Sequence, residues 1–147
     1  FMVVQDVDPD KKINNIVMAI DLTSQSMQVS KFAADVALRF DAQVHIIAHK
    51  ESDAALKRKT MVRFEILKKQ FEELGVDHVF KLIPSSSSLH KDVIKYGEKH
   101  QADMFAMAYS NDRIVQGFDK YSQSILTNEL KLPVLIINSK QVSNMYF

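Results

Sequence analysis

The feature that most constrains the fold is the nearly all-apolar run over residues 13–20, which ends on Asp21. A strand with so little alternation between apolar and polar side chains is usually buried on both faces, as in the middle of a parallel sheet covered by helices on both sides. In such sheets, ligands bind in the crevice beyond the carboxyl ends of the strands. Asp21 is therefore expected at the ligand-binding edge of the sheet.

Strand and helix patterns alternate along the rest of the chain. After the first strand, we predict strands over residues 43–49, 78–83, 102–108 and 134–138, and helices over residues 24–40, 53–74, 89–100 and 120–130. Ser24 or Ser26 can cap the first helix, and Gly75 is a suitable stop for the second. Strands joined by helices of this length form βαβ units with right-handed crossovers, so the sequence predicts an α/β fold with a parallel sheet.

The composition is that of an ordinary globular chain and excludes several kinds of partner. The 147 residues include 19 basic and 18 acidic side chains, well interspersed, so nothing electrostatic points to nucleic acid or an anionic membrane. There is no Cys, which excludes disulfides and thiolate chemistry. No apolar run approaches the roughly 20 residues that span a bilayer, and no signal peptide is visible, so a cytoplasmic location is expected.

The histidines do not form a metal-binding pattern. His45 and His49 are four residues apart on a predicted strand, which separates their Cα atoms by roughly 13 Å. His78, His90 and His100 lie at the ends of predicted elements, without a helical pair or a carboxylate at ligand spacing. We predict surface or hydrogen-bonded histidines, and no metal. A Gly-x-Ser-x-Gly elbow and a paired-carboxylate pattern are also missing, so no catalytic residue is predicted.

The first residues raise a question about domain organisation. Residues 1–12 read as an extension or linker, residues 13–140 as one domain and residues 141–147 as a tail. Residues 1–5 have the pattern of a strand with no helix before it, and they resemble the later strand 134–138. Two explanations stay open for them, namely the last strand of a preceding similar domain and a frayed terminal extension.

The order and spacing of three motifs resemble the universal stress protein family from residue 13 to residue 138. They are Ile16-Val-Met-Ala-Ile-Asp21 before a serine-containing helix start, Ala102-Asp-Met-Phe-Ala-Met107, and Leu132-Pro-Val-Leu-Ile-Ile137. The resemblance implies a three-layer αβα sandwich, Rossmann-like, with a five-stranded parallel sheet in the order 3-2-1-4-5. Some members carry two such domains in one chain, so we expect this chain to be the C-terminal half of a tandem protein.

The loop after the fourth strand decides between two branches of that family. Nucleotide-binding members carry a motif similar to Gly-x-x-Gly, followed by a Gly-Ser or Gly-Thr pair, after the fourth strand. The glycines let backbone N–H groups approach phosphate oxygens. Here Ala108 and Asn111 or Asp112 stand in the places of the first two glycines, and Gly117 is the only glycine of the segment 108–122. Side chains there would crowd a triphosphate, so we predict that tight ATP binding is lost and that no cofactor is held.

The resemblance also implies where a small ligand would bind. Asp21 matches the family Asp that contacts the adenosine part of a nucleotide, although a carboxylate at a strand end also suits the start of a helix. The other residues of the predicted ligand site are Ala19, Ala48, Ala108, Ser110, Asn111, Gly117 and Ser122.

The last strand is predicted to form a contact between domains. It is apolar and should lie at the edge of the sheet, and an exposed apolar edge favours pairing. We expect a homodimer or an intramolecular pseudo-dimer through Val134, Leu135, Ile136 and Ile137. The predicted function is therefore a non-catalytic universal stress protein-type domain, acting in stress response through dimerisation, protein contacts or weak small-ligand binding. The alternative is an ATP- or AMP-binding member with slow or no hydrolysis.

Overall fold

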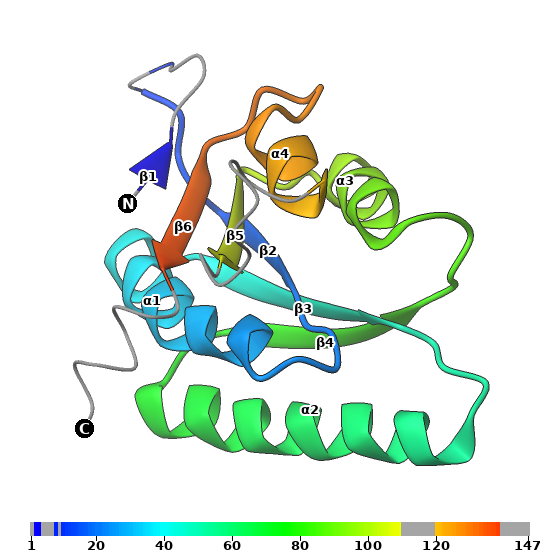
Figure 1. Ribbon diagram of the computed structural model, residues 1–147. Coiled ribbons are helices and arrows are strands. Elements are labelled where there is room, and N and C mark those ends of the chain that lie inside the picture. The colour runs from blue at the N-terminus through cyan, green and yellow to red at the C-terminus, as the bar shows by residue number, and fades with distance from the viewer. Residues whose placement is uncertain (1, 4–7, 9, 110–119, 139–147) are drawn as a thin grey trace.

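The computed structural model describes residues 2–3, 8, 10–109 and 120–138 (Figure 1). Its elements, in chain order, are β1 (Met2–Val3), β2 (Asn15–Ala19), α1 (Gln25–Phe40), β3 (Gln43–His49), α2 (Ala54–Leu74), β4 (His78–Ile83), α3 (Leu89–Lys99), β5 (Met104–Tyr109), α4 (Lys120–Leu126) and β6 (Val134–Asn138). Every predicted strand and helix is present, with small shifts at the ends. The α/β fold class is confirmed.

One sheet contains all the strands of the described residues, in the order β1-β6-β5-β2-β3-β4. The five strands from β6 to β4 are parallel, and their order is the predicted 3-2-1-4-5. The apolar strand β2 lies at the centre, between β5 and β3. Its last four residues are buried, as a strand covered on both faces requires.

Two apolar layers fill the space between the sheet and the helices. Alternate residues of β2 point to opposite faces, so Ile16 and Met18 pack with α1 and α2, whereas Val17 and Ala19 pack with α3 and α4. Figure 1 shows the two helix pairs on opposite sides of the sheet. The result is a three-layer sandwich in which the connections between strands, and not the strand interiors, are free to form a site.

The helix ends follow local chemistry in most places. The Asp53 carboxylate accepts a hydrogen bond from the backbone N–H of Leu56 at 2.9 Å and caps α2, and Gly75 ends that helix with a φ of 70°. Ser24 occupies the N-cap position of α1, but its side chain makes no capping hydrogen bond.

The helix predicted over residues 120–130 is shorter than expected and ends at Leu126. The buried Asn128 explains the early end. Its amide nitrogen donates to the carbonyls of Ile125 and Leu132, at 2.8 and 3.0 Å, and its amide oxygen accepts from the N–H of Leu132 at 2.9 Å. These bonds hold a turn that leads into β6, and they replace the hydrogen bonds of a further helical turn.

The prediction that the last strand forms the edge of the sheet is wrong for the first half of β6. Met2 and Val3 of β1 pair antiparallel with Leu135 and Val134. The backbone of residues 2–3 therefore occupies the position where a partner strand was expected. The free N–H and C=O groups at the edge of a sheet can form hydrogen bonds with an extended segment of the same chain as well as with another chain. Figure 1 shows β1 beside β6 at one side of the sheet.

Candidate functional site

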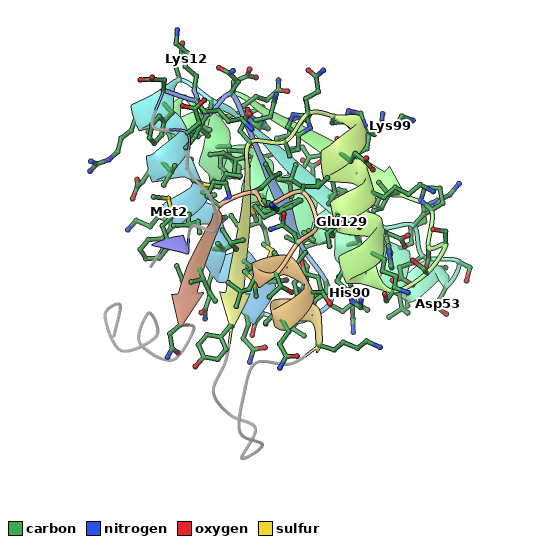
Figure 2. The ribbon with its side chains drawn as sticks, turned by 90° about the horizontal axis from the view of Figure 1, so that it is seen from above. Met2, Lys12, Asp53, His90, Lys99 and Glu129 are labelled. Atoms are coloured by element: carbon green, nitrogen blue, oxygen red, sulfur yellow. The ribbon has the colours of Figure 1, made fainter. Side chains whose placement is uncertain are left out.

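The candidate site lies at the end of the sheet where β2, β3 and β5 finish. Parallel strands present their carboxyl ends at one edge, and the first turns of α1 and α3 begin there. In Figure 2, His90 marks this end of the molecule, whereas Lys12 and Lys99 mark the opposite end. Two adjoining cavities open at this edge, and both are lined by Asp21, Thr23 and Leu89.

The smaller cavity, of about 320 Å³, lies between the ends of β2 and β3. Its lining residues are Ile20, Asp21, Leu22, Thr23, Ala48, His49, Glu51, Thr60 and Leu89. The apolar members form much of its surface, while Asp21 and Glu51 supply negative charge. The hydroxyl of Thr60 donates to the Leu56 carbonyl at 3.1 Å, so that proton is already used within the protein.

The larger cavity, of about 640 Å³, lies beyond the ends of β2 and β5. Its lining residues are Ala19, Asp21, Thr23, Gln25, Ser26, Leu89, His90, Met107, Ala108, Tyr109, Lys120, Tyr121 and Ser122. Among these described residues, Lys120 is the one Lys or Arg, and hydroxyl groups are numerous. An anionic group in this cavity would meet Lys120, whereas the lining of the smaller cavity includes the carboxylates Asp21 and Glu51 and no Lys or Arg among the described residues.

Asp21 is held at the boundary between the two cavities by its own loop. Its carboxylate oxygen Oδ1 accepts from the backbone N–H and the hydroxyl of Thr23, at 2.7 and 2.5 Å. The backbone N–H of Asp21 donates to the Ser26 hydroxyl oxygen at 3.1 Å. One carboxylate oxygen thus organises the turn into α1, and Oδ2 makes no hydrogen bond to a described residue. Asp21 serves the start of the helix and lines both cavities as well.

Arg63 of α2 fixes the backbone of the same loop. Its guanidinium donates to the carbonyls of Asp21 and Leu22, each at 2.8 Å, and to the carbonyl of Thr23. Three consecutive carbonyls converge on one planar, always charged group, which suits the fork of donors that arginine presents. The long helix α2 therefore determines the shape of the loop that carries Asp21.

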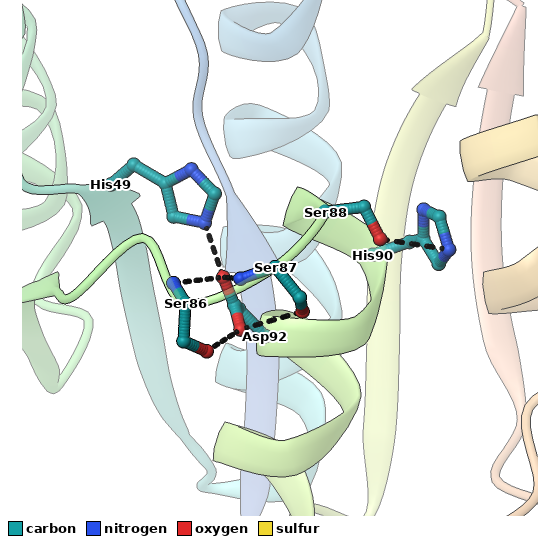
Figure 3. Close-up of polar contacts among 6 residues, drawn as sticks. All are labelled: His49, Ser86, Ser87, Ser88, His90 and Asp92. Atoms are coloured by element: carbon teal, nitrogen blue, oxygen red, sulfur yellow. Dashed lines mark hydrogen bonds and ion pairs between the residues drawn. The ribbon is translucent and has the colours of Figure 1, made fainter.

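A buried carboxylate connects the end of β3 to the start of α3 (Figure 3). Oδ2 of Asp92 accepts a hydrogen bond from Nε2 of His49 at 2.9 Å and from the backbone N–H groups of Ser86 and Ser87, at 3.2 and 3.3 Å. Oδ1 accepts from the two serine hydroxyls, at 2.6 and 3.1 Å. Burial by itself raises the pKa of the Asp92 carboxyl, but these hydrogen bonds outweigh it and lower the pKa from 3.8 to about 2.

His90 contributes a neutral ring to the larger cavity. Burial lowers the pKa of His90, and the positive charges of Lys120 and Lys91 lower it further. Its Nε2 lies 3.1 Å from the hydroxyl oxygen of Ser88, which precedes α3. The side chain is 7% exposed, so its contribution is a fixed polar surface and not a cation.

The remaining buried histidine lies at the other end of the sheet. His45 of β3 contacts the Tyr96 hydroxyl through Nδ1 at 3.0 Å and the Asn15 side-chain oxygen through Nε2 at 3.1 Å. The ring of Tyr96 stacks on His100, with centroids 4.1 Å apart. Burial lowers the pKa of His45, and the nearby His100 lowers it further. His45 and His49 therefore have separate partners at opposite ends of one strand.

The structure brings together five of the residues predicted for the ligand site. Asp21 lines both cavities, Ala48 lines the smaller one, and Ala19, Ala108 and Ser122 line the larger one. Ser110, Asn111 and Gly117 lie outside the described residues. Within the described part of the chain, no three acidic or histidine side chains gather as ligands for one metal ion, and no helix has the length and apolar character to cross a membrane.

Sequence reasoning missed the contact between His49 and Asp92. A weak signal was present, because His49 ends a predicted strand and Asp92 follows a run of four serines at the start of a helix. Nothing in the sequence states that these two elements meet. The missed contact matters because His49 also lines the smaller cavity.

Comparison with solved structures finds the same fold in universal stress proteins. A universal stress protein from Archaeoglobus fulgidus in complex with dAMP shares 15% identity, with 84% of this chain and 97% of that chain covered and a TM-score of 0.68. A universal stress protein in complex with cAMP shares 12% identity over 88% and 99% of the two chains, with a TM-score of 0.69. A universal stress protein family protein from Arabidopsis thaliana with AMP bound shares 9% identity over 85% and 90%, with a TM-score of 0.59.

These similarities are structural, since no protein-family model and no curated protein sequence matches this chain. At such low identity they establish the fold and not the ligand. The resemblance found in the sequence is confirmed at that level: the chain has the fold of the universal stress proteins.

Proposed function

We propose that the chain is a non-catalytic, universal stress protein-type domain that binds a nucleoside monophosphate weakly in the two adjoining cavities. The observation that carries this proposal is the difference between the cavities. The lining of the smaller one is mostly apolar and includes two carboxylates but no Lys or Arg among the described residues, and the larger one contains Lys120 and several hydroxyl groups. A ligand with a flat, uncharged base at one end and a phosphate at the other matches both.

Asp21 has a suitable position for the middle of such a ligand. It lines both cavities, and its Oδ2 is available to accept hydrogen bonds from sugar hydroxyls. The structural neighbours support the same class of ligand, since three of them are complexes with cAMP, dAMP and AMP.

The absence of catalysis is proposed from the sequence of the phosphate-side loop. The segment 108–122 has Gly117 as its only glycine, so side chains stand where a phosphate-binding turn presents bare backbone. Asp112 and Asp119 add negative charge to the same segment. Both features disfavour the binding of a triphosphate. A single phosphate would make fewer contacts with this loop and is therefore less affected.

Titration calorimetry with AMP, and with ATP plus magnesium, tests the proposal. We expect AMP to bind with a Kd of about 0.1–1 mM, and ATP to bind no more tightly. The variants Asp21→Asn and Lys120→Gln should each weaken AMP binding, because they remove the sugar acceptor and the cation. Micromolar affinity for ATP with release of phosphate would establish the alternative, a nucleotide-binding member with slow hydrolysis. No heat with either nucleotide at millimolar concentration would overturn the proposed ligand.

A role in stress response is part of the proposal, carried out through contact with other proteins or a second copy. The pairing surface would be β6, from Val134 to Ile137, as expected from the sequence. Since β1 already covers the edge at Val134 and Leu135, such pairing requires that Met2 and Val3 be displaced. A partner strand that is longer than the two-residue β1 would replace β1 beside β6 and would form more backbone hydrogen bonds with it.

A further inference from the structure

The contact between Asp92 and His49 fixes which nitrogen of His49 carries a proton. Asp92 is 6% exposed, and each of its oxygens accepts at least two hydrogen bonds. As a carboxylate it can only accept, so Nε2 of a neutral His49 must be the protonated nitrogen. Nδ1 then has a lone pair and acts as an acceptor.

Nδ1 of His49 is available to a ligand. In Figure 3 the ring nitrogen not bonded to Asp92 points away from that carboxylate. No hydrogen bond from a described residue reaches Nδ1, and His49 lines the smaller cavity. His49 is partly buried, with 18% of its side chain exposed, so a group that occupies the cavity can reach Nδ1 and donate a hydrogen bond to it.

The other polar side chains that line the smaller cavity are also hydrogen-bond acceptors without a free donor. Asp21 and Glu51 are acceptors, and the hydroxyl protons of Thr23 and Thr60 are used in bonds to Asp21 and to the Leu56 carbonyl. The described side chains of this cavity therefore offer acceptors and no free donor. A ligand group that carries N–H donors gains hydrogen bonds here, whereas a group without them leaves Nδ1 unpaired.

We propose that His49, positioned by Asp92, is a specificity-determining residue that selects an aromatic base with an exocyclic amino group. This inference rests on the proposed function, because it assumes that the base occupies the smaller cavity. The amino group donates to Nδ1 of His49, and the apolar residues Ile20, Ala48 and Leu89 pack against the faces and edges of the ring. Asp92 acts only through His49, as a positioning residue.

The test compares AMP with the 5′-monophosphate of purine riboside, which is AMP without its amino group. We expect the wild-type protein to bind AMP about tenfold more tightly, since a bound base covers Nδ1 of His49, and an acceptor that is covered but left unpaired is costly. In His49→Phe the preference should fall to within about threefold, because the ring remains and the acceptor is gone. His78→Phe is the matched control, since His78 bonds to the Val76 carbonyl and stacks on Phe71 away from both cavities.

A second measurement needs no variant, and its first part, the tautomer of His49, needs no ligand. Two-bond ¹H–¹⁵N correlation spectra of the wild-type protein at pH 8 report the tautomer of each histidine. We expect His49 to carry its proton on Nε2, and addition of AMP should shift its Nδ1 resonance and not that of His78. A proton on Nδ1 would overturn the inference, even if His49→Phe fails to fold.

The outcomes separate this inference from the proposed function. If neither nucleotide binds to the wild-type protein, the proposed function fails and this inference fails with it. If AMP binds but the wild-type protein does not distinguish the two ligands, or if His49→Phe keeps the preference, His49 is not the selecting residue. In that case the domain is still a nucleotide-binding module.

Discussion

Gly97 of α3 lies so close to Phe105 of β5 that a Cβ at position 97 would stand 2.7 Å from the ring atom Cζ. Phe105 is 1% exposed and belongs to the apolar cluster between the sheet and α3, so its ring cannot turn out into solvent. The missing side chain lets α3 approach the sheet closely. This matters for the site, because the first turn of α3 carries His90 and Asp92.

Gly97→Ala should destabilise the protein, although alanine is the better helix former. The gain in helix propensity is about 1 kcal/mol, and overpacking against a fixed ring costs about 1–3 kcal/mol. We expect the free energy of unfolding to fall by up to about 2 kcal/mol in urea denaturation. Phe105→Leu in the same background should recover part of this loss, which a double-mutant cycle measures. A higher stability of Gly97→Ala, or no coupling to Phe105→Leu in the cycle, would contradict the close contact.

Asp92 should make the fold sensitive to strong acid. Its folded pKa, about 2, lies below the ordinary value of 3.8, so the carboxylate form is the one that the native state favours. This stabilisation is fully present above about pH 4 and is lost as pH falls through about 2. We expect a loss of roughly 1–2 kcal/mol over that range, and a smaller loss in Asp92→Asn. Denaturation curves with the same pH dependence in both proteins would disprove this role of Asp92.

His45 should produce a second, milder pH dependence. Burial, and then the charge of His100, lower the pKa of His45 below the ordinary value of 6.5. The unfolded chain therefore binds a proton more readily than the native protein, and stability decreases as pH falls below 6.5 toward the folded pKa. We expect His45→Gln to reduce the slope of the free energy of unfolding between pH 6.5 and 5. The prediction fails if the wild-type slope in this range equals that of the variant.

Arg63→Gln should loosen the loop that carries Asp21. The guanidinium donates to three consecutive carbonyls, and hydrogen bonds from a charged donor are worth more than neutral ones. We expect amide hydrogen exchange over residues 21–26 to become about 10-fold faster or more, with little change in global stability. Arg58→Gln is the control, because Arg58 is an exposed residue of the same helix. Equal exchange in the two variants would show that Arg63 does not hold the loop.

Removal of residues 1–5 should change the association of the chain. The deletion takes away β1 and leaves the backbone edge of β6 without its partner at Val134 and Leu135. An uncovered apolar edge favours pairing with another strand, so we expect the truncated chain to form dimers at concentrations where the full chain does not. Sedimentation velocity measures this. A truncated chain that remains monomeric at the highest soluble concentration would argue against β6 as a pairing surface.

The sequence predicted the order of elements well because burial patterns are local. The apolar run ending at Asp21 identified the central strand, and the stop at Gly75 was confirmed with the left-handed backbone expected of a helix end. The end of α4 was not predicted. It depends on Asn128, whose side chain bonds to backbone groups on both sides of a turn that only the fold places together.

The sequence alone determined the α/β layering and the position of Asp21, because both follow from the apolar periodicity of neighbouring residues. Only the tertiary structure decided what surrounds Asp21. The pairing of β1 with β6, the clamp from Arg63 and the bond between His49 and Asp92 join segments that lie far apart in the chain. Such contacts depend on which elements the sheet order brings side by side, and hydrogen bonds between distant side chains leave no periodic pattern in the sequence.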